Sequence, residues 1–214
     1  MSILLGCVAD DFTGATDLAN TLVKAGMRTI QLLGVPPKRL AVPESDCVII
    51  ALKSRSNPVA EAISQSLAAL DWLRVQGARQ YYFKYCSTFD STDQGNIGPV
   101  ADAMLDALGE DFTVFNPAFP TNKRTIYKGH LFVGDELLSE SGMRNHPLTP
   151  MTDPLLPRVL QRQTPHKVGA LHVATVEQGV PALKDAFRDF RARGVRHVVL
   201  DSLTDAHLKT LGEA

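Results

Sequence analysis

Residues 3–25, ILLGCVADDFTGATDLANTLVKA, constrain the fold more strongly than any other stretch of the chain. The apolar run 3–8 ends at two adjacent carboxylates, Asp10 and Asp11, and a segment with helical spacing follows Gly14. This order indicates a strand, an acidic turn and a helix. In an open parallel sheet, ligands bind beyond the carboxyl ends of the strands. We therefore expect the turn at residues 9–14 to belong to the functional site.

The alternation of apolar runs and helical patterns continues along the chain. Further strands are predicted at residues 27–33, 47–52, 80–84, 112–115, 168–173 and 195–200, and further helices at residues 58–76, 99–108, 180–193 and 203–211. The run 47–52, CVIIAL, is apolar throughout, which is typical of a strand covered on both faces. This alternation predicts an α/β fold with a mostly parallel sheet, right-handed crossovers and Rossmann-like layers of flanking helices.

Residues 116–153 interrupt the pattern with a long stretch rich in Pro, Gly, Thr, Asn and His. Such a stretch is usually either a functional loop or a disordered linker. It has too much apolar and aromatic surface for a solvated linker, in Phe119, Tyr127, Leu131, Phe132 and Val133. We predict a long irregular functional loop. Its histidines, His130 and His146, lack the helical spacing of a zinc pair, so hydrogen bonding to a ligand or to the loop backbone is favoured.

Composition narrows the class of protein. With 214 residues, 44% of them hydrophobic, the chain can bury the core of one large domain or two small ones. A net charge of -1 provides no global field for nucleic acid or an anionic membrane. The three cysteines form no CxxC pattern, which suits a reducing compartment. With no signal-peptide pattern and no apolar run near the roughly 20 residues of a membrane span, we expect a soluble, cytoplasmic protein.

The paired carboxylates Asp10 and Asp11 have two interpretations. They can accept hydrogen bonds from the hydroxyls of a ligand, or one can take a hydroxyl proton while the other stays ionised. Alternatively, Asp11 or Thr13 caps the following helix, which leaves Asp10 available. A phosphatase of the haloacid dehalogenase type needs a second aspartate two residues after the first, and that position is Phe12.

Two cations follow neighbouring strands. Arg55 lies in the KSRS segment after the strand at 47–52, and Lys84 closes the strand at 80–84. A guanidinium suits a carboxylate, which it binds in bidentate fashion, whereas an ammonium is a compact charge for a phosphate or carboxylate. A surface ion pair is the alternative for Arg55. Its position beside other polar strand ends favours a binding site.

A hydroxyl-rich loop precedes the helix predicted at 99–108. Hydroxyls, small residues and a helix N-terminus can together hold oxyanions or sugar hydroxyls. Turn chemistry alone also accounts for much of this composition. The candidate ligand-binding residues of the loop are Ser87, Thr88 and Asp90.

Together, the motifs ADDFTGATD, KSRS and KYCSTFDSTDQGNIGPV and the segment from NPAFP to TPMTD resemble the N-terminal half of the four-carbon acid sugar kinase family. The resemblance covers essentially the whole chain and is strongest to the bacterial 3-oxo-tetronate 4-kinase branch. Lys123 departs from the pattern, because the family has a glycine before the residues that correspond to Arg124 and Thr125.

The resemblance implies a two-domain enzyme that uses ATP and Mg²⁺ to phosphorylate the terminal 4-hydroxyl of 3-oxo-tetronate or another four-carbon sugar acid. Residues 1–214 would form the sugar-acid-binding half. The nucleotide and the metal would be bound mainly by a C-terminal half that this chain lacks, in keeping with the absence of a Walker A pattern. We expect the isolated chain to bind the substrate without turning it over.

The resemblance and the chemistry together predict a role for each site residue. Asp10 and Asp11 would bind chain hydroxyls, with Asp11 orienting or deprotonating the attacking hydroxyl. Arg55 and Lys84 would anchor the substrate carboxylate or steady the transferring phosphoryl group. The remaining predicted contacts are Thr13, Ser87, Thr88, Asp90 and His130.

Three alternatives stay open. In the first, the chain is half of a threonate or erythronate kinase. In the second, it is a non-catalytic sugar-acid-binding domain left by truncation. In the third, it is a hydrolase that uses the paired aspartates with a metal. The oligomeric state is also open, a homodimer included.

Overall fold

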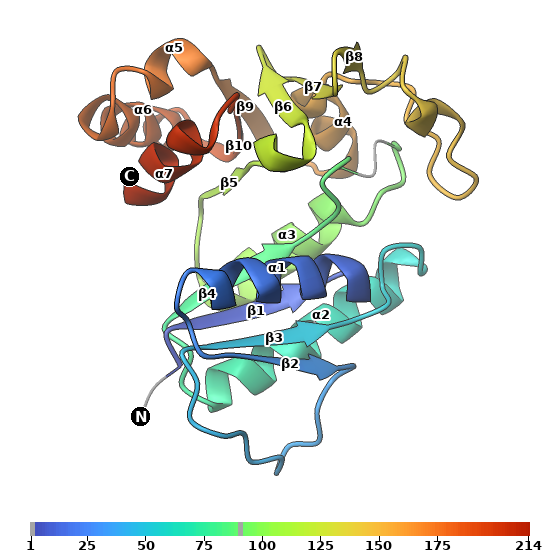
Figure 1. The fold of residues 1–214 in the computed structure, drawn as a ribbon, viewed down its shortest axis with the longest axis vertical. Coiled ribbons are helices and arrows are strands. Elements are labelled where there is room, and N and C mark those ends of the chain that lie inside the picture. Colours follow the sequence, from blue (N-terminus) through green and yellow to red (C-terminus); the bar gives the residue numbers. More distant parts are fainter. Residues whose placement is uncertain (1–2, 90–91) are drawn as a thin grey trace. The chain divides into compact units, whose positions relative to one another are not determined.

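A computed structural model describes residues 3–89 and 92–214 (Figure 1). The chain divides into two compact units. Unit 1 comprises residues 1–86 and 99–107, and unit 2 comprises residues 87–98 and 108–214. The parallel strands are shared between two sheets, one in each unit, rather than forming a single sheet.

Unit 1 contains a four-stranded sheet with the order β2-β3-β1-β4, and every neighbouring pair is parallel. The strands are β1 (Leu5–Ala9), β2 (Thr29–Leu33), β3 (Cys47–Ala51) and β4 (Gln80–Lys84). All five residues of β3 are buried, as its apolar run predicts. The predicted strands of this unit are therefore confirmed, with shifts of one or two residues at some ends.

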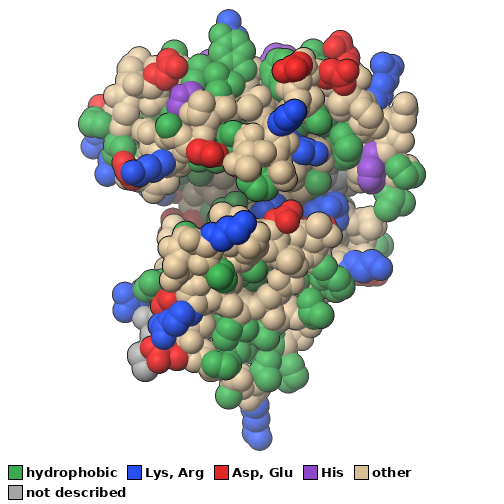
Figure 2. Space-filling view, viewed as in Figure 1, with side chains coloured by type: hydrophobic (Ala, Val, Ile, Leu, Met, Phe, Trp, Pro, Cys, Tyr) green, Lys and Arg blue, Asp and Glu red, His purple; other side chains and the backbone are tan. Residues whose placement is uncertain are grey.

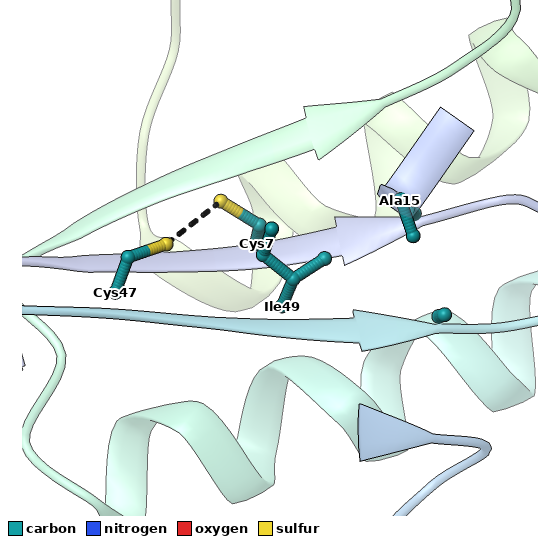
Figure 3. Packing of buried hydrophobic residues seen from close by; sticks show 6 residues of the cluster. Cys7, Ala15, Cys47 and Ile49 are labelled. Atoms are coloured by element: carbon teal, nitrogen blue, oxygen red, sulfur yellow. Dashed lines mark hydrogen bonds between the residues drawn. The ribbon is translucent and has the colours of Figure 1, made fainter. Parts of the chain in front are cut away.

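Helices cover both faces of this sheet. They are α1 (Phe12–Lys24), α2 (Val59–Val75) and α3 (Ile97–Leu108), most of which belongs to unit 1. Cys7 and Ile49 pack with Ala15 of α1 in one buried cluster (Figure 3). On the other face, a Cβ added to Gly6 would lie 3.3 Å from the Cβ of Leu73 in α2. This alternation follows from the two-residue period of a strand.

The buried thiols of Cys7 and Cys47 point toward each other, with their Sγ atoms 3.8 Å apart (Figure 3). Both side chains are fully buried in the cluster below α1. No disulfide joins the three cysteines, all of which lie in the described part of the chain. The two thiols therefore behave as small apolar groups of the core.

The connections of unit 1 create a topological switch point at β1. From β1 in the interior of the sheet, α1 leads to the edge strand β2, while α2 leads from β3 past β1 to the other edge strand, β4. Since α1 and α2 cover opposite faces, the chain leaves the neighbourhood of β1 in two directions. In open α/β sheets, ligands bind at such a switch point, beyond the carboxyl ends of the strands.

Unit 2 contains a parallel sheet with the order β5-β10-β9. Its strands are β5 (Thr113–Phe115), β9 (Lys167–Leu171) and β10 (Val195–Leu200). Its helices are α4 (Leu156–Gln163), α5 (Val173–Val176), α6 (Val180–Ala192) and α7 (Asp205–Glu213). Leu183 and Phe190 of α6 pack against Val198 of β10 in the core of this unit.

The segment 116–153, predicted to be irregular, contains a small antiparallel sheet with the order β6-β7-β8. Its elements are η1 (Pro120–Asn122), β6 (Arg124–Tyr127), β7 (His130–Val133), β8 (Glu136–Leu137) and η2 (Gly142–Asn145). Strands of two to four residues are too short to show a period in the sequence. Lys123 has a φ of 56°, which explains why a glycine would suit this position.

The surface carries a mixture of charges. Figure 2 shows Lys and Arg side chains interspersed with Asp and Glu side chains over the visible face. Within residues 3–89 and 92–214, none of the helices combines the length and the apolar character that crossing a membrane requires.

Candidate functional site

Four of the predicted site residues come together at the carboxyl edge of the sheet in unit 1. Asp10 and Asp11 follow β1, Arg55 follows β3, and Lys84 ends β4. The backbone N–H of Arg55 donates to the carbonyl of Asp10 at 3.2 Å, and the N–H of Asp10 donates to the carbonyl of Lys84 at 3.0 Å. These bonds continue the strand pairing past the strand ends and hold the loops together.

A forked ion pair lies at the centre of this cluster. The Nε of Arg55 donates to Oδ2 of Asp10 at 3.1 Å, and its Nη2 donates to Oδ1 at 2.7 Å. The Asp10 residue is only 4% exposed, and the side chain of Arg55 is 26% exposed. The pair is therefore a largely desolvated bidentate contact rather than an ion pair on the open surface.

Asp11 joins the same cation and also begins the helix. Its Oδ1 lies 2.7 Å from Nη2 of Arg55 and accepts the N–H of Gly14 at 2.9 Å. Asp11 is thus the N-cap of α1, while the exposed side chain of Thr13 forms no hydrogen bond with any described residue. The second oxygen, Oδ2, accepts no hydrogen bond from residues 3–89 or 92–214. It is the open acceptor of the cluster.

Burial and pairing change the acidity of this pair. Burial raises the pKa of Asp10 above its ordinary value, and the charge of Asp11 adds to the rise. The hydrogen bond and charge of Arg55 oppose it, as does the charge of Lys84. Burial also acts to lower the pKa of Arg55, but the hydrogen bond and charge of Asp10 outweigh it, and the pKa lies above its ordinary value. The guanidinium therefore stays charged.

Lys84 also lies beside the first turn of α1. Its half-buried ammonium donates to the carbonyl of Tyr85 at 2.7 Å. A Cβ built on Gly14 would lie 3.4 Å from this Nζ and 2.6 Å from Oδ1 of Asp11. Gly14 is therefore needed for the close approach of Asp11, and the ammonium of Lys84 borders the same helix turn.

Thr13 lies in α1 of unit 1, and the other predicted residues that the structure describes, Ser87, Thr88 and His130, belong to unit 2. Ser87 is half-buried and Thr88 is 3% exposed, while Asp90 lies outside the described residues. His130 opens β7, where its Nδ1 lies 2.9 Å from the carbonyl of Lys128. His146 accepts the N–H of Thr149 at 3.1 Å through its Nδ1. Both imidazoles thus bond the backbone of the segment they belong to.

Asp201 is an organising residue of unit 2 that the sequence reasoning missed. It follows β10 and is fully buried. Its carboxylate accepts the N–H groups of Lys128 at 2.7 Å, Gly129 at 2.8 Å and Val173 at 3.1 Å, and Nδ1 of His172 lies 3.4 Å away. The sequence contains the pattern that would have identified it: Asp201 directly follows an apolar strand, as Asp10 does.

The bonds of Asp201 hold the two-residue turn between β6 and β7. Lys128 has a φ of 49° and Gly129 a φ of 74°, and a type I′ hairpin turn requires positive φ at both positions. A non-glycine residue in this region is uncommon, and it persists where surrounding contacts determine the backbone. The buried carboxylate supplies those contacts.

Comparisons with known proteins identify relatives of the whole chain. A family model described as "Sugar-binding N-terminal domain" matches residues 5–214. A 3-oxo-tetronate kinase of Burkholderia multivorans is 62% identical over 211 residues, which are 99% of this chain and 49% of the relative. A solved Haemophilus influenzae protein has a TM-score of 0.95 at 53% identity, over 98% of this chain and 50% of that chain.

A more distant solved structure carries a ligand. It is a domain of unknown function from Bordetella bronchiseptica, described as a domain-swapped dimer with bound citrate. It has a TM-score of 0.76 at 29% identity, over 99% of this chain and 51% of that chain. The present chain therefore spans about half the length of the relatives it matches.

Proposed function

Since this chain belongs to the family of sugar-binding N-terminal domains, we propose that it is the acceptor half of an ATP-dependent kinase for a four-carbon sugar acid. The proposed substrate is 3-oxo-tetronate, and the proposed product is 3-oxo-tetronate 4-phosphate. The proposal is supported by the 62% identity to a 3-oxo-tetronate kinase. The observation that carries it is the cluster of two carboxylates around one guanidinium at the carboxyl edge of the sheet.

The chemistry of the cluster suits a polyhydroxylated acid. Ionised carboxylates accept hydrogen bonds from hydroxyls, and Asp11 has an oxygen that no described residue occupies. The guanidinium of Arg55 contacts both Asp10 and Asp11 and offsets one of their two negative charges, which lets both carboxylates lie side by side. The ammonium of Lys84 brings a second cation to the same helix turn.

Within this proposal, Asp11 holds the attacking 4-hydroxyl and accepts its proton as the phosphoryl group is transferred. Both oxygens of Asp10 are taken by Arg55, whereas Oδ2 of Asp11 remains open toward a ligand. A base must lie within hydrogen-bond reach of the proton it removes. Phosphoryl transfer depends largely on positioning and on charge stabilisation, so an acceptor half contributes by fixing the hydroxyl in place.

The nucleotide side of the reaction is assigned to the part of the relatives that this chain does not span. ATP and Mg²⁺ would supply the phosphoryl group and its charge neutralisation. Within residues 3–89 and 92–214, no three His, Cys, Asp or Glu side chains are grouped to hold a metal ion. We assign the metal mainly to the nucleotide side of the reaction and derive no step through it.

Two further features complete the proposal. The proposed compartment is a reducing cytoplasm. It is supported by Cys7 and Cys47, which are free thiols although their Sγ atoms lie only 3.8 Å apart. A homodimer is the proposed assembly, supported by the dimer described for the Bordetella bronchiseptica relative. Size-exclusion chromatography with light scattering measures the second feature directly.

Calorimetric titration of the chain with 3-oxo-tetronate, threonate, erythronate and ATP tests the proposed function. We expect a sugar acid to bind and ATP not to bind. Binding of ATP without any sugar acid would overturn the assignment. A second arm adds the C-terminal half of the Burkholderia multivorans kinase and measures phosphate transfer. Rescue of transfer supports a kinase half, whereas binding without rescue supports a non-catalytic sugar-acid-binding domain.

A further inference from the structure

We infer that the two cations of the site have different roles: Arg55 positions the two aspartates, and Lys84 binds the carboxylate of the substrate. This inference rests on the proposed function and specifies how the site selects an acid. Arg55 and Lys84 carry the same charge, so their charge alone does not distinguish their roles. The distinction follows from what each cation already contacts within unit 1.

The guanidinium of Arg55 already contacts two carboxylates of its own chain. Three contacts of 3.1 Å or less join its guanidinium to Asp10 and Asp11. A substrate carboxylate at Arg55 would have to displace a buried aspartate or add a third anion to one guanidinium. Leaving a buried charge without its partner is strongly unfavourable. Arg55 is therefore a positioning residue that sets the geometry of the carboxylates toward the ligand.

Lys84 has N–H donors that are available to a ligand. An ammonium has three N–H donors, and in the described part of the chain only one is used, by the carbonyl of Tyr85. No carboxylate of residues 3–89 or 92–214 forms an ion pair with Lys84. The lysine is half-buried, so an anion that binds it is partly shielded from water. A charge-assisted hydrogen bond is stronger under these conditions.

The position of Lys84 fits a short acid. Its Nζ and Oδ1 of Asp11 both lie close to the same point above Gly14, at 3.4 Å and 2.6 Å from the place that a Cβ on Gly14 would occupy. A four-carbon acid is long enough to place its carboxylate at Lys84 and its terminal hydroxyl at Asp11. The N-terminal turn of α1 adds a favourable potential for the carboxylate.

The test compares two ligands that differ only at the first carbon. 3-Oxo-tetronate carries a carboxylate there, and erythrulose carries an uncharged hydroxymethyl group. Each is titrated into the wild-type chain, Lys84→Met, Arg55→Lys and Arg55→Gln, with protein-observed NMR to reach millimolar affinities. Lys24→Met, at the exposed far end of α1, is the matched control for loss of a lysine charge. Circular dichroism checks that each variant is folded.

Lys84→Met should weaken binding of 3-oxo-tetronate by about tenfold to a hundredfold, the range of one charge-assisted hydrogen bond, and leave erythrulose within about twofold. Arg55→Gln should weaken both ligands by similar factors, and Arg55→Lys should restore part of both affinities. Arg55→Gln should also move the pH midpoint of acid binding upward, because the guanidinium no longer lowers the pKa of Asp10. Lys24→Met should change none of these results.

The outcomes separate this inference from the proposed function. Unchanged acid binding by Lys84→Met, with normal binding by the wild type, would overturn the role of Lys84 and leave the proposed function standing. Selective loss of the acid in Arg55→Gln, with erythrulose unaffected, would reverse the two roles. Failure of the wild-type chain to bind any sugar acid would overturn both the proposed function and the inference.

Discussion

Asp10 in unit 1 and Asp201 in unit 2 occupy the same place in their sheets and are held in different ways. Each follows a buried parallel strand, and each is almost completely buried. Asp10 is paired with the side chain of Arg55, whereas Asp201 accepts three backbone N–H groups. The partner of Asp10 is a side chain at the carboxyl edge of its sheet, whereas the partners of Asp201 are backbone groups that the fold fixes. We therefore predict that Asp10 takes part in ligand binding and that Asp201 has a structural role.

Asp201→Asn should give the largest loss of stability. The amide group would face backbone donors that now point at a carboxylate oxygen, leaving at least one buried N–H unsatisfied. We expect a loss of about 3 kcal/mol in the free energy of unfolding. Urea unfolding followed by circular dichroism measures it, and hydrogen exchange at Lys128 and Gly129 reports the turn. An unchanged urea midpoint would show that Asp201 does not hold the turn.

Asp10→Asn should destabilise the fold less than Asp201→Asn does, and it should strongly weaken binding of the sugar acid. The amide oxygen can still accept from Arg55, and the guanidinium keeps Asp11 as an ionic partner. We expect a loss of about 1–2 kcal/mol in the free energy of unfolding, together with at least about tenfold weaker binding of 3-oxo-tetronate. Calorimetry and urea unfolding measure the two effects. If Asp10→Asn costs as much stability as Asp201→Asn and leaves binding intact, the distinction between the two aspartates is wrong.

Gly14→Ala tests the contact between the helix cap and the site. The new Cβ would lie 2.6 Å from Oδ1 of Asp11, so the carboxylate must move and α1 loses its cap. We expect a loss of about 1 kcal/mol in the free energy of unfolding. Gly142→Ala is the matched control, because its added Cβ meets no atom within 4 Å. Equal thermal midpoints for the two variants would show that the cap tolerates the displacement.

The pH dependence of stability should show the smallest effect and a definite sign. Because burial raises the pKa of Asp10 above its ordinary value of 3.8, the folded chain retains this proton after the unfolded chain has lost it. The contribution of Asp10 is therefore fully present below 3.8 and is lost as the pH rises through the folded pKa. The difference in unfolding free energy between wild type and Asp10→Asn should fall by at most about 1.4 kcal/mol per pH unit.

Asp46 provides the control of opposite sign. Arg28 lowers the pKa of its carboxyl to about 2 from an ordinary 3.8, through hydrogen bonds and charge. Its contribution to stability is present above 3.8 and is lost as the pH falls through about 2. Urea midpoints of wild type, Asp10→Asn and Asp46→Asn between pH 2 and pH 7 compare the two slopes. Slopes of the same sign would contradict the environment assigned to Asp10.

Much of the site was predictable because it depends on strand ends. The apolar run of β3 and the helical period of α2 are long enough to identify, and polar residues mark the points where strands stop. Since parallel strands end at one edge, Asp10, Arg55 and Lys84 were predicted to be neighbours and are so. The family resemblance predicted from the motifs is confirmed by the match to residues 5–214.

Other features depend on details of backbone conformation or on contacts between residues far apart in the sequence. The choice of Asp11 over Thr13 as the cap is a matter of local backbone angles, which the motif leaves open. The short strands β6 to β8 exist because they pair with one another and with the rest of unit 2, as in the bridge between Ile126 and Ser202. The hydrogen bonds between Asp201 and the β6–β7 turn join residues more than seventy positions apart in the sequence.

The sequence by itself determined the α/β class, the strand ends that carry charge, and the family. Each depends on a local pattern or on a motif that is read along the chain. Only the tertiary structure decided that the parallel strands form two sheets and that Arg55 holds both aspartates while Lys84 keeps open donors. The physical reason is that partners are chosen by distance and burial in three dimensions, and a sequence records which charges are present but not which of them meet.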